Sequence, residues 1–268
     1  MKIGGSKMRI AAFQFHTTGN IHENLAKICV TVDRAAELGV QLLAFPECAL
    51  TGYPPRDIPS SSAVDRASLD KAHKELQVLA DHHRMYLIVG TMTRMERGIH
   101  NTVMSFCPGA QPISYHKRAL WGWDRDNFIP GDEPGIVEID GVRIGIRICF
   151  EVRFPEYFRE LYRQKTDINV IPFYYVSDRD DLVRYDLIRS HIRTRAVENV
   201  CPILTVNAVS PFQTAPTMLT GASGQILAET ERNREELLVY DFIPQPPDFG
   251  ERGRKEISDQ LLLEHRQK

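Results

Sequence analysis

The stretch VRIGIRICFEVRFPE (142–156) decides how this chain folds. Its first half alternates apolar residues with others, which is typical of a β-strand. Pro155 is a favoured first residue of a helix, and the residues that follow it have helical spacing over 156–162. The stretch therefore predicts a strand, a turn and a helix, with Cys149 at the turn.

The predicted position of Cys149 suits a nucleophile. At a turn from a strand to a helix, a side chain projects from the sheet edge. Backbone N–H groups at the helix start there stabilise a thiolate and an oxyanion. A buried, unreactive thiol is the common alternative for a single cysteine. Position alone leaves both interpretations open, so the choice depends on residues elsewhere in the chain.

The bulk composition is ordinary for a soluble globular protein. The 268 residues are 43% apolar and 25% charged, enough for one large α/β domain or two small ones. The formal net charge of −2 gives no electrostatic reason to expect nucleic acid or a membrane as a partner. Five scattered cysteines without metal-site spacing indicate reduced thiols in a cytoplasmic protein, and we expect no metal and no cofactor. No apolar run approaches the roughly 18 residues of a membrane span, and residues 1–7 are expected to be an unstructured leader.

Strand and helix patterns alternate along the rest of the chain. We expect helices at about 20–39, 61–83 and 181–199, and strands at 8–15, 40–45, 86–91, 100–107, 112–116, 135–139, 142–148, 168–172, 201–207, 217–219, 225–229 and 237–241. Two halves rich in strand–helix units surround antiparallel strands in this order. The pattern predicts an α/β fold of two mixed sheets packed together and covered outside by helices.

The C-terminal tail differs from the rest. A proline-rich segment at 244–247 interrupts regular structure, and 251–268 is a charged helical segment with an apolar patch. We therefore predict one domain over 8–243 and an extension over 244–268. The extension is expected to pack on its own domain or on an oligomer partner.

Two further strand ends carry residues that a catalytic thiol requires. Such a thiol needs a base to take its proton and a donor to stabilise the oxyanion. Glu47 follows the apolar strand at 40–45, and Lys117 follows the strand at 112–116, where an ammonium would also favour a thiolate. Each has a plainer explanation when taken alone, a helix cap or solvated carboxylate for Glu47 and ordinary surface for Lys117.

Several motifs, in order, closely resemble those of the nitrilase superfamily of carbon–nitrogen hydrolases, in its amidase-like branch. They are FPE (45–47) with TGY (51–53), YHK (115–117) with FIPGD (128–132), RICFE (147–151) with FPE (154–156), and RAVEN (195–199). The likeness runs from about residue 8 to residue 242. It implies a four-layer αββα sandwich, a Glu–Lys–Cys catalytic triad, and dimers or larger assemblies.

The resemblance assigns roles to four positions. Glu47 would be the general base and Cys149 the nucleophile, while Lys117 and the backbone N–H of Phe150 would stabilise the tetrahedral intermediate. Thiolate attack on an amide carbonyl would release ammonia or an amine. Water activated by Glu47 would then hydrolyse the acyl-thioester.

One segment departs from the family pattern. Many members carry a second glutamate shortly before the motif that begins at Phe128, whereas the segment WGWDRDNF (121–128) has none. Asp124 falls at the matching distance and is the first candidate to replace it, with Asp126 second. An acidic surface loop is the alternative.

Aromatic residues near the strand ends are candidates for the substrate pocket. Tyr53 lies just past Glu47, and Phe173, Tyr174 and Tyr175 follow a strand expected to end near Cys149. We expect them to line an acyl pocket, with ordinary packing as the alternative. Asn101 is expected to be a structural hydrogen-bonding residue.

The predicted function is that of a thiol amidohydrolase. Its substrate would be a small linear amide of the ω-amide or N-carbamoyl type, and the protein would be a homodimer or a higher homo-oligomer. A nitrilase and an N-acyltransferase on the same fold stay open. A non-catalytic binding protein is a further alternative, although Glu47, Lys117 and Cys149 are all present.

Overall fold

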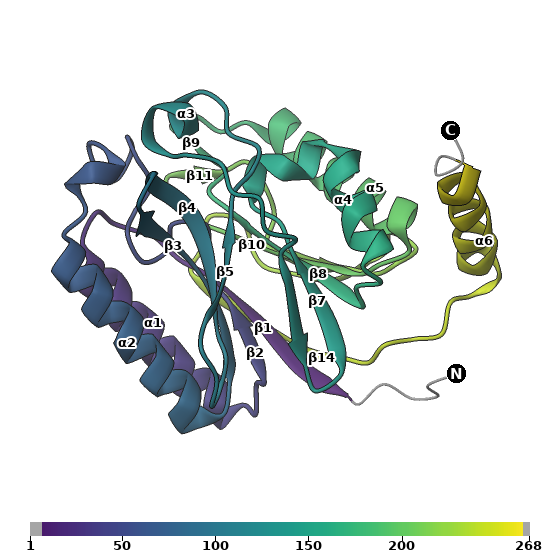
Figure 1. Ribbon diagram of the computed structural model, residues 1–268, viewed down its shortest axis with the longest axis horizontal. Helices are drawn as coiled ribbons and strands as arrows, with labels where there is room; N and C mark the ends of the chain where they lie inside the picture. The colour runs from purple at the N-terminus through teal and green to yellow at the C-terminus, as the bar shows by residue number, and fades with distance from the viewer. Residues whose placement is uncertain (1–6, 265–268) are drawn as a thin grey trace.

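The computed structural model describes residues 7–264 as two mixed sheets packed face to face, with helices on their outer faces (Figure 1). This arrangement confirms the predicted αββα sandwich. The leader expected at 1–7 lies, except for Lys7, outside the described residues. Among these residues, no helix is long and apolar enough to cross a lipid bilayer.

The two six-stranded sheets have the same pattern of strand directions. In order across the first sheet the strands are β14 (Glu236–Phe242), β1 (Met8–Gln14), β2 (Leu42–Ala44), β3 (Tyr86–Met95), β4 (Gly98–Phe106) and β5 (Ile113–His116). Across the second they are β6 (Ile136–Ile139), β7 (Val142–Ile146), β8 (Ile168–Phe173), β10 (Ile203–Asn207), β12 (Met218–Thr220) and β13 (Ile226–Glu229). In both, the successive pairings are antiparallel, parallel, parallel, antiparallel and antiparallel. Strands β2 and β8 are thus the middle strands of two equivalent parallel triplets.

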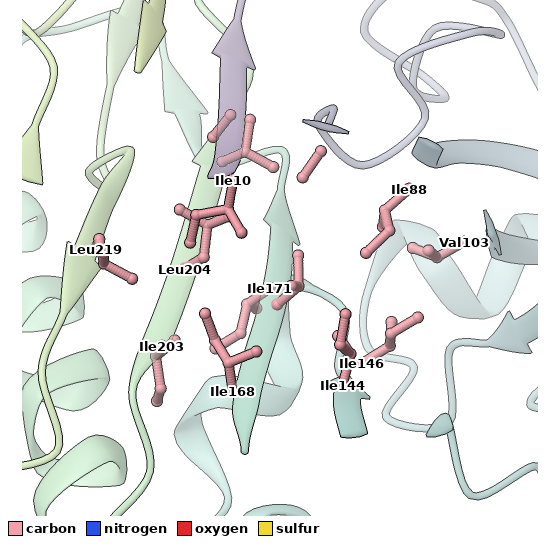
Figure 2. Packing of buried hydrophobic residues seen from close by; sticks show 14 of the residues in the cluster. Ile10, Ile88, Val103, Ile144, Ile146, Ile168, Ile171, Ile203, Leu204 and Leu219 are labelled. Carbon is pink, nitrogen blue, oxygen red and sulfur yellow. The ribbon is translucent and has the colours of Figure 1, made fainter. Parts of the chain in front are cut away.

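Alternating side chains of each strand separate the inner core from the helix layers. On β1, Ile10 and Ala12 join the core between the sheets, whereas Ala11 packs beneath the helices. Figure 2 shows Ile10 close to Leu204 of the second sheet. Helices α1 (Ile21–Glu37) and α2 (Arg66–His83) cover the first sheet, and α4 (Pro155–Arg163) and α5 (Leu182–Asn199) cover the second (Figure 1).

The structure differs from the sequence expectations in several local details. The helix expected at 61–83 is divided into a short 3-10 turn η1 (Ser61–Ala63) and α2, because Asp65 caps α2 by accepting a hydrogen bond from the N–H of Ser68. Strands β3 and β4 form a longer hairpin than expected. Elements that were not predicted are α3 (Trp123–Asn127), the 3-10 turn η2 (Cys149–Arg153) and the two-stranded pair β9 (Val176–Ser177) with β11 (Phe212–Gln213).

The C-terminal helix α6 (Phe249–Glu264) contacts α4 of its own chain through polar groups. The hydroxyl of Tyr162 donates to Asp259 at 2.8 Å, and the guanidinium of Arg159 donates to the hydroxyl of Ser258 at 2.9 Å. The side chains of Ile257 and Leu261 are 54% and 48% exposed. The domain limits of 8–243 and 244–268 stay a prediction.

Candidate active site

The structure brings Glu47, Lys117 and Cys149 together at the ends of three strands. Glu47 follows β2, Lys117 follows β5, and Cys149 begins η2, with two residues between it and the end of β7. The backbone N–H of Glu47 donates to the carbonyl of Phe173 at the end of β8, over 3.3 Å, so the two parallel triplets meet here. Carboxyl ends of parallel strands are where open α/β sheets place their ligands.

Lys117 lies between two carboxylates. Its Nζ is 2.7 Å from Oε1 of Glu47 and 2.7 Å from Oδ2 of Asp124. Burial of Lys117 lowers the pKa of its ammonium, but attraction to Asp124 and Glu47 outweighs burial and raises that pKa well above its ordinary value. Lys117 is therefore a fixed cation at neutral pH, almost wholly buried and held by two anions.

Cys149 occupies a turn that constrains its backbone. Its φ is 47°, in the left-handed region that few residues other than glycine adopt. Burial and the negative charge of Glu47 raise the pKa of its thiol well above the ordinary value, and the charge of Lys117 offsets this only in part. The neighbouring ammonium thus favours the thiolate, as expected, but burial and Glu47 outweigh it in the resting site. A base has to remove the proton when the sulfur attacks.

Two neighbours fix the carboxylate of Glu47. The side-chain amide of Asn101 on β4 donates to its Oε1 at 2.7 Å, and the backbone N–H of Tyr174 donates to its Oε2 at 2.9 Å. The sequence indicated only a structural role for Asn101. The only sign of this contact in the sequence is that Asn101, a polar residue, lies within a predicted strand.

The short helix α3 carries Asp124 into the site. Asp124 is 3% exposed, and its Oδ1 accepts a hydrogen bond of 2.8 Å from the hydroxyl of Tyr53, while its Oδ2 contacts Lys117. Asp126 is exposed on the other side of the same helix. Of the two candidates to replace the family's second glutamate, the structure places Asp124 on the lysine.

A cavity of about 480 Å³ opens in front of these residues. Lys117, Asp124, Cys149 and Phe150 form part of its wall. The aromatic residues on its wall are Tyr53, Trp121, Trp123, Phe150, Tyr174 and Tyr175. The rings of Tyr53 and Tyr174 stack with centroids 4.7 Å apart.

Phe173 does not line this cavity, contrary to the expectation. It is fully buried in the core, and only its backbone carbonyl reaches the site, where it accepts the hydrogen bond from Glu47. Strand β8 continues to Phe173, and alternation along the strand turns this side chain into the core. Tyr174 and Tyr175, which follow the strand, lie on the cavity wall instead.

Asp57 is a site residue that the sequence did not single out. Its carboxylate accepts hydrogen bonds from the hydroxyl of Tyr174 at 2.8 Å and from the backbone N–H of Tyr53 at 2.9 Å. It therefore fixes both stacked rings. Among residues 7–264, no group of three or more histidine, cysteine or acidic side chains is arranged to hold a metal ion.

This fold, with its site at the strand ends, places the protein in the class of αββα hydrolases. The profile of the carbon–nitrogen hydrolase family matches residues 9–245, and the chain belongs to that family. It is accordingly a hydrolase of carbon–nitrogen bonds other than peptide bonds.

Proteins similar to this chain include other enzymes of the family. It is 28% identical to a hydrolase of Mycobacterium tuberculosis over 76% of this chain and 73% of that protein. It is 26% identical to the 2-oxoglutaramate amidase of Bacillus subtilis over 87% of this chain and 89% of that enzyme.

A solved amidase from Nesterenkonia sp. has the same fold. The TM-score is 0.79 at 26% identity, over 97% of this chain and 98% of that one. Further structures of the Nesterenkonia amidase contain butyramide in a cysteine-to-alanine mutant, and an acetamide group attached covalently to the active-site cysteine.

Proposed function

We propose that this carbon–nitrogen hydrolase is a thiol amidohydrolase that cleaves a small linear amide through an acyl-thioester on Cys149. The observation that carries the proposal is the buried Glu47–Lys117–Asp124 ion cluster, of which Lys117 and Asp124 line one cavity together with Cys149. A base, a cation and a sulfur nucleophile are the groups that acyl transfer from an amide requires.

In the first half-reaction, Glu47 takes the proton of the Cys149 thiol as the sulfur attacks the amide carbon. The oxygen of the tetrahedral intermediate becomes negative and is stabilised by the ammonium of Lys117 and the backbone N–H of Phe150. Protonated Glu47 then gives its proton to the leaving nitrogen. The C–N bond breaks, ammonia leaves, and the acyl group stays on sulfur.

In the second half-reaction, Glu47 takes a proton from water, and the resulting oxygen nucleophile attacks the thioester carbon. Collapse of the second intermediate breaks the C–S bond, releases the carboxylic acid and returns the proton to sulfur. Asp124 does not exchange a proton in either step. It keeps Lys117 charged and oriented, the part taken in many relatives by a second glutamate.

The similar proteins support a linear amide as the substrate. The amidase of B. subtilis is named for 2-oxoglutaramate, and the Nesterenkonia amidase was solved with butyramide. A cavity of about 480 Å³ has ample room for an amide of this size.

Ammonia release from a panel of short amides, carbamoyl amines and nitriles tests the proposal. We expect release from at least one amide, abolished in Cys149→Ala and unchanged in Cys29→Ser, whose half-buried thiol lies between α1 and α2 and bonds Glu75. Iodoacetamide should modify Cys149 and stop turnover, and a substrate amide should slow that modification. Turnover that persists in Cys149→Ala would overturn the proposal.

We also propose that the protein forms a homodimer or a larger homo-oligomer in solution. The exposed apolar side chains at the start of α5 support this proposal, since they are unusual on a free surface. Leu182, Val183 and Leu187 are 60%, 83% and 48% exposed. Sedimentation of the purified protein at micromolar concentration measures its mass directly, and a mass of one chain would contradict the proposal.

A further inference from the structure

The mouth of the cavity carries positive charge that no nearby carboxylate balances. Arg56 on this rim is neutralised by Asp178 at 2.5 Å. Arg179 and Arg184 also line the cavity and are exposed. Among residues 7–264, no ion pair joins either of these two guanidinium groups to an acidic side chain.

The acidic residues between these two arginines are engaged elsewhere. Asp180 pairs with Arg232 at 2.6 Å. Asp181 caps helix α5 by accepting a hydrogen bond of 2.8 Å from the backbone N–H of Arg184. The rim therefore offers two guanidinium groups to whatever occupies the cavity.

The base of the cavity has the opposite character. The one ammonium there, on Lys117, is shared by Glu47 and Asp124, and the raised pKa of Cys149 keeps its thiol neutral at rest. This base has an excess of one negative charge, and it would repel an anionic group. A bound molecule with one neutral end and one anionic end is thus oriented by the charges alone, with the neutral end at the thiol.

Arg184 contacts an aromatic ring on the wall of the cavity that Cys149 also lines. Its guanidinium carbon is 5.6 Å from the centroid of the Tyr175 ring, which lies on the cavity wall. Burial raises the pKa of the Tyr175 phenol, and a thiolate on Cys149 would raise it further, which places the two residues near each other. The hydroxyl of Tyr175 accepts a hydrogen bond of 3.2 Å from Arg153, which fixes the ring.

We propose that the cavity selects an amide whose far end carries a carboxylate, and that Arg184, assisted by Arg179, binds that carboxylate. The inference rests on the proposed amidohydrolase function and names its substrate class. Two or three methylene groups between the amide carbon and the carboxylate span about 4–5 Å, at about 1.5 Å per bond, and Cys149, Tyr175 and Arg184 line the one cavity that such a molecule would enter. A guanidinium presents paired N–H donors that match the two oxygens of a carboxylate.

The apolar part of such a molecule also finds a surface. Trp121 and Trp123, at 64% and 51% exposed, lie on the same cavity wall and offer apolar area for the methylene groups. The cavity thus combines a neutral amide site at its base, an aromatic wall and a cationic rim.

Matched pairs of amides test the proposal. Succinamate and butyramide have the same four-carbon length, and glutaramate and valeramide have five, so each pair differs only by a carboxylate in place of a methyl group. We expect the wild-type protein to have a higher kcat/KM for the carboxylate member of at least one pair. Added NaCl should reduce that preference, because the two arginines are exposed.

The variants Arg184→Gln and Arg184→Lys test the residue itself. Arg184→Gln should lower kcat/KM for the preferred carboxylate amide by about 10- to 100-fold, as expected for lost hydrogen bonds to a charged group. The loss should lie mainly in KM, and turnover of the neutral amide should change by less than about twofold. Arg184→Lys should recover part of the loss, and Arg179→Gln should cause a smaller one. Arg254→Gln, an exposed position on α6, is the control.

Two results overturn the proposal. One is a wild-type protein that hydrolyses the neutral amides as well as the carboxylate amides or better. The other is a preference that survives in the Arg179→Gln/Arg184→Gln double variant. If ammonia release still depends on Cys149, either result rejects only the proposed substrate class. The proposed amidohydrolase function then stands. If no amide is hydrolysed, both fail together.

Discussion

The carboxylate of Glu151 accepts a hydrogen bond of 2.7 Å from the backbone N–H of Ile148, the residue before Cys149. The same carboxylate accepts a second hydrogen bond, of 2.8 Å, from the backbone N–H of Arg118, the residue after Lys117. Glu151 has no exposed surface. One buried carboxylate therefore joins the nucleophile turn of the second sheet to the lysine segment of the first.

Replacing Glu151 with glutamine tests this connection. Each oxygen of Glu151 accepts from one of these backbone N–H groups, so the amide nitrogen of Glu151→Gln would face a donor at either position. We expect the free energy of unfolding to fall by about 2–3 kcal/mol, the size of lost hydrogen bonds to a charged group. We expect kcat to fall by about 10²-fold, because Cys149 and Lys117 lose their common support.

The control for this prediction is Glu156→Gln, an exposed position in the first turn of α4. It should change the free energy of unfolding by less than about 0.5 kcal/mol. Urea unfolding and steady-state kinetics measure both effects. A Glu151→Gln protein in which kcat is unchanged would contradict the positioning role, even if its stability is reduced.

Removing the central cation should destabilise the protein more than removing one of its anions. Lys117→Met leaves Glu47 and Asp124 buried with no positive charge between them, and we expect a loss of about 3–5 kcal/mol in the free energy of unfolding. Asp124→Asn leaves a one-to-one ion pair and should cost less. Urea unfolding of both variants gives the order directly, and the reverse order would show that the ion cluster is not the stabilising unit.

Glu47→Gln should separate the reactivity of the thiol from catalysis. The charge of Glu47 raises the pKa of Cys149, so its removal should lower that pKa. The pH midpoint for alkylation of Cys149 by iodoacetamide should therefore move down, while ammonia release falls by about 10²- to 10⁴-fold through loss of the base. Mass spectrometry of Cys149 against pH measures the first effect. A midpoint that stays constant or rises would refute the electrostatic argument.

The sequence predicted the residues that stand alone at strand ends. Glu47, Lys117 and Cys149 each follow an apolar or alternating run, and a polar side chain at such a position is visible in the one-dimensional pattern. The layers of sheet and helix were also predictable, because apolar residues recur with a different spacing in strands than in helices. The pattern placed these three residues at strand ends, whereas their grouping into one site came from the resemblance to the family.

Contacts between distant segments were not predictable in this way. Asn101 reaches Glu47 only because β3 and β4 pair along their whole length and place β4 beside the site. Arg184 belongs to the rim only because the segment before α5 returns over the cavity. In both cases the decisive information is the packing of elements that lie far apart in the sequence.

Gly90 on β3 shows how closely the sheet approaches the proposed base. A Cβ atom added at Gly90 would lie 2.0 Å from the carbonyl oxygen of Pro46, 2.6 Å from the Cα of Glu47 and 2.6 Å from the backbone nitrogen of Cys48. All three are backbone or Cα atoms, so no side chain can rotate away. The carbonyl of Gly90 also accepts a hydrogen bond of 3.0 Å from the N–H of Leu50, which ties the same turn to the strand.

Gly90→Ala should therefore displace Glu47 from its partners. We expect a loss of about 1–3 kcal/mol in the free energy of unfolding, typical of overpacking, and a decrease of about 10²-fold in kcat, because a displacement near 1 Å costs that much. Gly253→Ala on α6 is the matched control, since nothing lies within 4 Å of its added Cβ, and helix propensity should make it neutral or slightly stabilising. Thermal unfolding and ammonia release measured on both variants decide the matter. If Gly90→Ala keeps full activity, the position of Glu47 does not depend on its contact with β3, and its hydrogen bonds and its ion pair with Lys117 would be enough to hold the base.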